Sequence, residues 1–75
     1  MMDERLRTTI AEVLSVPIEE VGPETSPVTQ PRWDSLRHMN LVFAIEEAFS
    51  VQFDDEEIPA LTSVAAIEEA LARRL

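Results

Sequence analysis

Residues 33–49 read Trp-Asp-Ser-Leu-Arg-His-Met-Asn-Leu-Val-Phe-Ala-Ile-Glu-Glu-Ala-Phe, and this stretch decides the fold. Its apolar residues recur every three or four positions, as they do along one face of an α-helix. We therefore expect a helix from Ser35 to about Ser50, with Asp34 as the N-cap. At about 100° per residue, one side of this helix gathers an apolar stripe that suits a protein core: Leu41, Val42, Ile45 and Phe49.

The opposite side of the same helix carries a second apolar stripe, made of Leu36, Met39 and Phe43. Glu47 lies on this outer face and Glu46 lies at its edge. A small bundle needs only one stripe to face its core, and grouped exposed apolar residues often mark a contact surface. We expect the outer face to bind partners. In the alternative, the bundle buries this helix nearly all round, with Trp33 and the preceding loop covering the outer stripe.

Two further segments carry a helical period. The first runs from about Asp3 to Leu14, with Asp3 as N-cap and Pro17 blocking any extension. Its stripe is Leu6, Ile10, Val13 and Leu14. The last helix is expected to begin after Thr62 or Ser63 and to run to the end of the chain, where Arg73 and Arg74 complement the helix dipole. Its stripe is Val64, Ile67, Leu71 and Leu75.

The segments between these helices differ in character. Residues 15–33 hold four of the five prolines and the only glycine, so they predict a long irregular loop. Its apolar residues are expected to pin it to the core: Val16, Ile18, Val21 and Val28. The acidic run 54–57 predicts the first turn of a short third helix that ends near Leu61 and is weakened by Pro59. The whole pattern predicts an all-α, four-helix bundle, with three longer helices and one short one, in a single domain over 1–75.

Charge and composition exclude several classes of function. Fifteen acidic residues face six arginines, and the net charge is −9. This balance argues against nucleic-acid binding and against anionic membrane surfaces, and it suits partners with basic docking surfaces. The chain has no cysteine and one histidine, which excludes a disulfide framework and a multi-histidine metal site. No apolar run predicts membrane insertion, and the first residues lack a signal-peptide pattern, so we expect a cytoplasmic protein.

Ser35 is the residue with the clearest chemical interest, and it is not expected to be a catalytic nucleophile. A serine hydrolase needs a histidine base oriented by a carboxylate. The only histidine, His38, lies three residues away and is poorly aligned with Ser35 on the helix. No glycine-rich turn surrounds the serine, so the chain is not expected to be an enzyme. A hydroxyl at a helix start tolerates an added anion, and on the residues alone Ser35 is either a modification site or simply a good first-turn residue.

A family resemblance separates these two readings. Asp34-Ser35-Leu36, near the middle of a small acidic chain, resembles the attachment motif of acyl carrier proteins. The segments 41–49, 54–58 and 61–67 resemble the family's second helix, its short acidic third helix and the entry to its last helix. The resemblance covers essentially the whole chain and is most specific over residues 33–71.

The resemblance implies that a phosphopantetheinyl transferase uses coenzyme A and Mg²⁺ to attach 4′-phosphopantetheine to Ser35, with Asp34 helping to place the metal. The cofactor's thiol then carries an acyl group as a thioester, so the chain itself needs no cysteine. Five positions match the family's partner-recognition residues: Leu36, Met39, Phe43, Glu46 and Glu47. The interior that receives the acyl chain in many members is lined here by Leu41, Ile45, Phe49, Ile58 and Ile67.

The chain departs from the usual pattern around the motif, at Trp33, Arg37, His38 and Asn40. These departures favour a stand-alone carrier of a specialised lipid or secondary-metabolite pathway, such as polyketide synthesis, over one of housekeeping fatty acid biosynthesis. Trp-Asp-Ser-Leu together with the acidic surface favours acyl cargo, and we expect a monomer. Its partners are expected to be acyl-activating, acyltransferase or synthase enzymes. An aminoacyl or peptidyl carrier remains the nearest alternative, and an unmodified helical interaction module is the alternative from another class.

Overall fold

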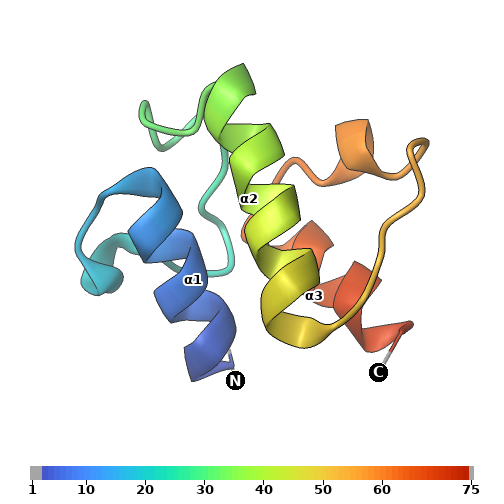
Figure 1. Ribbon diagram of the computed structural model, residues 1–75. Helices are drawn as coiled ribbons and strands as arrows, with labels where there is room; N and C mark the ends of the chain where they lie inside the picture. The colour runs from blue at the N-terminus through green and yellow to red at the C-terminus, as the bar shows by residue number, and fades with distance from the viewer. Residues whose placement is uncertain (1–2, 75) are drawn as a thin grey trace.

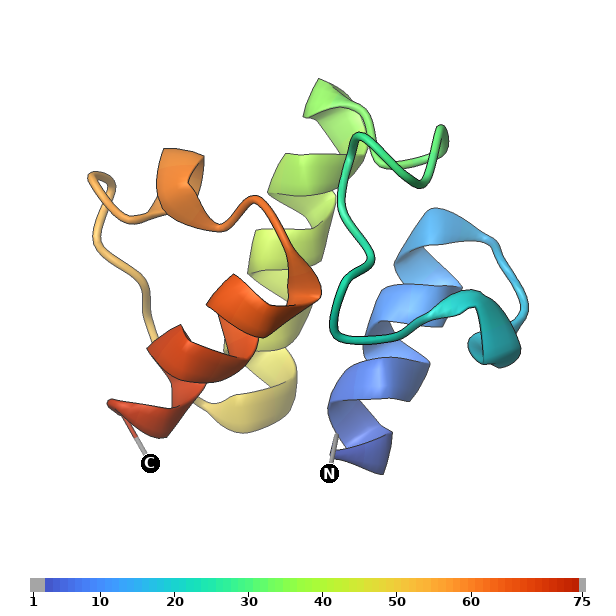
Figure 2. The same ribbon diagram turned by 180° about the vertical axis from the view of Figure 1, so that it is seen from behind.

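The computed structural model describes residues 3–74 and contains three α-helices: α1 (Glu4–Leu14), α2 (Ser35–Phe49) and α3 (Val64–Ala72). Two single 3₁₀ turns, η1 (Ile18–Glu20) and η2 (Ile58–Ala60), lie in the connections, and no strand occurs among these residues. The predicted all-α fold is confirmed. Figures 1 and 2 show α2 in the middle, with α1 on one side and α3 on the other. No helix within 3–74 is both long and apolar enough to span a bilayer.

The helix starts follow the predicted caps. Asp3 accepts hydrogen bonds from the backbone N–H groups of Arg5 at 2.8 Å and Leu6 at 3.2 Å, and Ser63 accepts one from Ala66 at 3.1 Å. Each bond satisfies an N–H group that has no partner inside its own helix.

The ends of α1 and α2 are set by backbone conformation. The cap residues Ser15 and Ser50 adopt left-handed φ angles of 57° and 54°. The chain reverses there, and the next N–H group bonds back to a carbonyl of the last turn, as in a Schellman motif. The helix α1 therefore ends before Pro17 has any effect on it.

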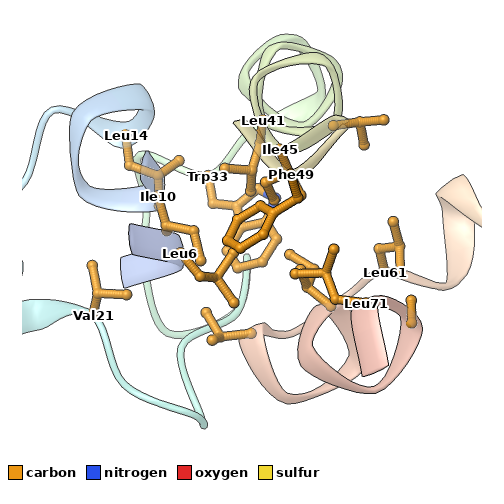
Figure 3. Packing of buried hydrophobic residues seen from close by; sticks show 14 of the residues in the cluster. Leu6, Ile10, Leu14, Val21, Trp33, Leu41, Ile45, Phe49, Leu61 and Leu71 are labelled. Atoms are coloured by element: carbon orange, nitrogen blue, oxygen red, sulfur yellow. The ribbon is translucent and has the colours of Figure 1, made fainter. Parts of the chain in front are cut away.

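The core is formed by the inward stripes of the three helices (Figure 3). The predicted stripes are buried, except that Val13 is only partly buried, and Leu75 lies outside the described residues. Trp33 is 2% exposed, and Figure 3 shows it among the side chains of α1 and α2. The interpretation that Trp33 covers the outer stripe of α2 is therefore wrong, because its indole fills the interior.

The long loop between α1 and α2 is tied to α3. The backbone N–H groups of Val64 and Ala65, in the first turn of α3, donate to the carbonyls of Thr25 at 2.9 Å and Pro23 at 3.0 Å. Val21 is buried in the core, whereas Val28, which was expected to pin the loop, is 93% exposed. Hydrogen bonds to the first turn of α3, in addition to the buried Val21, therefore hold the loop against the rest of the fold.

The expected short third helix is smaller than predicted. Residues 55–57 form a turn, and η2 adds a single 3₁₀ turn with Pro59 inside it. Proline has no N–H group to donate and crowds the preceding turn, so an α-helix cannot develop there. The acidic run also serves a long-range contact, because the Glu57 carboxylate pairs with Arg74 and Arg73 at the end of α3.

This pairing gives a pH-dependent prediction for Glu57. Its hydrogen bond with Arg74, helped by the N–H group of Asp54, lowers the pKa of the Glu57 carboxyl from its ordinary value of 4.5. A carboxyl whose pKa is lower in the folded chain stabilises that chain above the unfolded value, and the contribution is lost as pH falls through the folded value. Glu57→Gln should therefore lower the melting temperature at neutral pH, and the deficit should disappear in acid.

Glu56→Gln is the matched control, because it removes the same charge from an exposed neighbour that forms no ion pair among the described residues. Thermal melts of both variants and the wild type across pH measure the difference. An equal deficit for the two variants at neutral pH would contradict a specific role of the Glu57 ion pairs.

Candidate functional site

Ser35 is the first residue of α2, and its side chain is exposed. The preceding residue, Asp34, has an extended backbone and caps the helix: its Oδ1 accepts a hydrogen bond from the Arg37 N–H at 2.9 Å. Its Oδ2 lies 3.2 Å from Nη1 of Arg37. Figures 1 and 2 place the start of α2 at the end of the molecule opposite to the start of α1 and the end of α3. The serine hydroxyl is thus accessible on a fixed helix end.

The electrostatics around Ser35 suit an anion. Asp34 caps the helix through the N–H group of Arg37. The N–H groups of Ser35 and Leu36 therefore still point out of the N-terminal end of this 15-residue helix, toward a possible anion. The first turn of α2 contains no acidic residue. Arg37 holds its guanidinium against Asp34, immediately before the serine. A phosphodiester on the Ser35 oxygen would lie at the positive end of the helix dipole, so the start of α2 fits a phosphate-linked group, while Arg37 balances the charge of Asp34.

A pocket of about 560 Å³ opens beside Ser35, a volume in the usual range for small-molecule sites. One side comes from the loop before α2 and the first turns of that helix: Pro27, Trp33, Asp34, Ser35, His38 and Met39. The other side comes from η2 and the residue before the α3 cap: Ile58, Pro59 and Thr62. A flexible chain attached to Ser35 therefore has a mainly apolar surface within immediate reach.

His38 is committed to hydrogen bonds within the wall of this pocket. The indole Nε1–H of Trp33 donates to His38 Nδ1 at 3.0 Å, and His38 Nε2 lies 2.8 Å from the carbonyl oxygen of Ile58. Since an indole N–H can only donate, Nδ1 must accept and Nε2 must carry the proton. Both ring nitrogens are occupied, so His38 is not free to act as a base toward Ser35.

The outer face of α2 is exposed, as predicted. Leu36 is 74%, Phe43 58% and Met39 36% exposed. Glu47 is exposed beside them, whereas Glu46 is half-buried and its Oε2 accepts a hydrogen bond from the Phe53 N–H at 2.8 Å. Among the five predicted recognition residues, Glu46 therefore also stabilises the fold, because its hydrogen bond fixes the backbone at Phe53, shortly after the end of α2.

The residues predicted to line an interior acyl site lie mainly in the bundle interior and not in the pocket beside Ser35. Four of them are packed in the core at 7% exposure or less: Leu41, Ile45, Phe49 and Ile67. Only Ile58 reaches the pocket beside Ser35. Sequence reasoning missed the pocket residues Trp33, His38 and Pro59 as a group. The unusual pair Trp33 and His38 next to the motif was the one available signal.

A family model described as "Phosphopantetheine attachment site" matches residues 4–71, which include all three helices apart from the last residue of α3, as well as the pocket beside Ser35.

Proposed function

This chain belongs to the phosphopantetheine attachment-site family, whose domains are non-catalytic carriers of covalently attached 4′-phosphopantetheine, and we propose that Ser35 is the residue that holds the cofactor. The observation that carries the proposal is the exposed Ser35 hydroxyl at the first position of α2, on the rim of the pocket. The helix start favours the negative charge of a phosphodiester there.

The chain's own residues have distinct tasks at this site. Asp34 fixes the first turn of α2 through the Arg37 N–H, and during modification its carboxylate would help to place the metal ion. Leu36, Met39, Phe43 and Glu47 present an apolar surface with an acidic margin to partner enzymes. When bound, the cofactor supplies a thiol that carries the cargo as a thioester.

We further propose a stand-alone, monomeric acyl carrier of a specialised pathway in the cytoplasm, formed by one domain over 1–75. A core that is complete within residues 6–71 supports the single domain. The first turn of α2, with Arg37 and no acidic residue, supports partners other than housekeeping fatty-acid enzymes, since docking surfaces are matched by charge. Its partners are a phosphopantetheinyl transferase and acyl-activating, acyltransferase or synthase enzymes with basic surfaces.

Intact-mass analysis tests the attachment. The protein is incubated with coenzyme A, Mg²⁺ and a broad-specificity transferase, and one phosphopantetheine per chain is expected. A chain that gains no mass would instead be an unmodified interaction module. Mass analysis after reaction of the loaded form with acyl-activating and aminoacyl-activating enzymes then separates the two carrier types, because only the matching class adds cargo.

The outer face of α2 gives a prediction about partners. Phe43→Ser should change the free energy of unfolding by less than about 0.5 kcal/mol, because the ring is exposed. It should weaken binding to a partner enzyme by about 1–2 kcal/mol, as loss of an aromatic interface residue does. Titration by fluorescence anisotropy measures the affinity.

Two glutamates provide a matched pair of charge controls. Glu47 lies on the outer face of α2 and Glu12 on α1, and both are exposed. Glu47→Gln should lower the rate of association with a partner enzyme and make that rate less dependent on salt concentration. Glu12→Gln should change neither quantity. Equal effects of the two variants would mean that partners sense only the net charge.

A further inference from the structure

Three residues of the pocket wall form a continuous hydrogen-bonded chain. Trp33 donates to His38, and His38 donates to the carbonyl oxygen of Ile58, at 3.0 and 2.8 Å. The two rings are nearly parallel, with 21° between their planes and 6.1 Å between their centroids, as expected for rings that meet edge to edge through a hydrogen bond. The indole fixes the histidine tautomer, and the histidine in turn holds a backbone group twenty positions away.

This chain links α2 to η2, two parts of the fold that share no other hydrogen bond among residues 3–74. The segment before η2 is anchored to α2 at Phe53, through Glu46, and to the end of α3 through Glu57. If the bond from His38 were absent, η2 could move away from the first turns of α2 without breaking any other hydrogen bond to that helix.

The same residues separate the pocket from the core. Trp33 belongs to the buried cluster and Ile58 packs against it, yet both also line the pocket. The same buried cluster contains Ile45 and Ile67, each 1% exposed. His38 and Ile58 both line the pocket, and the hydrogen bond between them joins α2 to η2 in its wall.

We infer that Trp33, His38 and the Ile58 carbonyl form a latch that keeps cargo out of the bundle interior. Acyl cargo on the arm then stays outside the core, on the surface beside Ser35, and remains accessible to partner enzymes. His38 and Trp33 are positioning residues in this scheme, because they act through η2 and not on the cargo's reacting atoms. The inference rests on the proposed attachment of the arm to Ser35.

Methyl NMR of the loaded protein tests the latch. The modified wild type is prepared with an acetyl and with a decanoyl thioester, after intact mass has established that the arm is present. Exchange of acetyl for decanoyl is expected to shift the methyl signals of Met39 and Ile58, which line the pocket, and to leave those of Ile45 and Ile67 unchanged. Nuclear Overhauser contacts between the decanoyl chain and Ile45 or Ile67 in the wild type would overturn the inference.

Two substitutions of the histidine isolate the hydrogen bonds. His38→Leu removes both bonds, so the decanoyl chain should now shift Ile45 and Ile67. His38→Gln keeps a donor and an acceptor on one side chain and should behave like the wild type. If the His38→Leu variant carries the decanoyl thioester and its Ile45 and Ile67 signals stay unchanged, as in the wild type, the latch is wrong. If this variant does not fold, the methyl spectra of the wild type alone test the inference.

A separate measurement needs no arm and so distinguishes failure of the latch from failure of the proposed function. In the unmodified protein, long-range ¹H–¹⁵N spectra should show neutral His38 with its proton on Nε2 and a bare Nδ1. Trp33→Phe removes the indole donor and should release this tautomer preference. A proton on Nδ1 in the wild type would contradict the hydrogen-bonded chain, whereas absence of the arm on Ser35 would be seen only by mass.

Discussion

Replacement of Ser35 by alanine is expected to abolish phosphopantetheine attachment completely and to leave the fold unchanged. The side chain is exposed and, within residues 3–74, makes no hydrogen bond. Asp34 caps α2 through the Arg37 N–H and does not use the serine. Alanine is also the best helix former, so the free energy of unfolding should change by less than about 0.5 kcal/mol. Intact mass after reaction with coenzyme A and a transferase measures the loss.

Ser26 provides the matched serine control. It lies in the loop before α2, where its Oγ accepts hydrogen bonds from the Val28 N–H at 3.2 Å and the Thr29 N–H at 3.4 Å. Ser26→Ala removes these local bonds and should still accept one phosphopantetheine. A mass gain in the Ser35→Ala variant would show that another hydroxyl is the acceptor. Absence of the mass gain in Ser26→Ala would show that the transferase also recognises the loop.

Local signals made the helices of this fold predictable. Asp3, Asp34 and Ser63 each hydrogen-bond an N–H group within three residues, so their capping roles depend only on nearby sequence. The apolar stripes depend on the helical repeat alone. The short helix expected after residue 54 was overestimated for the same reason, because the acidic run resembles a first helical turn. In the structure Pro59 limits this element to one 3₁₀ turn, and Glu57 pairs with Arg74 near the end of the chain.

The candidate site was predictable on its exposed side and not on its inner side. The position of Ser35 and the exposure of Leu36 and Phe43 follow from helix geometry once α2 is placed. The contact from His38 to Ile58 could not be predicted, because its acceptor is a backbone carbonyl, which every residue carries, twenty positions along the chain. The expected interior acyl lining was assigned from the family resemblance, and four of its five residues lie in the packed core.

Trp33 connects the site to stability, and its replacement by alanine should have the largest effect on folding. The indole is 2% exposed, and removal of a buried tryptophan side chain costs about 3–5 kcal/mol. Small domains bury a limited share of their surface and lie toward the lower end of an overall range of about 5–15 kcal/mol. Trp33→Ala should therefore lose most of its stability, with the melting temperature falling by about 4–8 °C for each kcal/mol.

Trp33→Phe separates packing from hydrogen bonding in this loss. Phenylalanine keeps an aromatic ring in the core but cannot donate to His38 Nδ1, so we expect a cost of about 1–3 kcal/mol, mainly from the unpaired acceptor. Urea unfolding followed by circular dichroism measures both variants. If alanine and phenylalanine cost the same, the hydrogen bond and not the ring carries the stability. If Trp33→Ala costs less than about 1 kcal/mol, the indole does not occupy the core, and the inner wall of the pocket beside Ser35 would have to be formed by other residues.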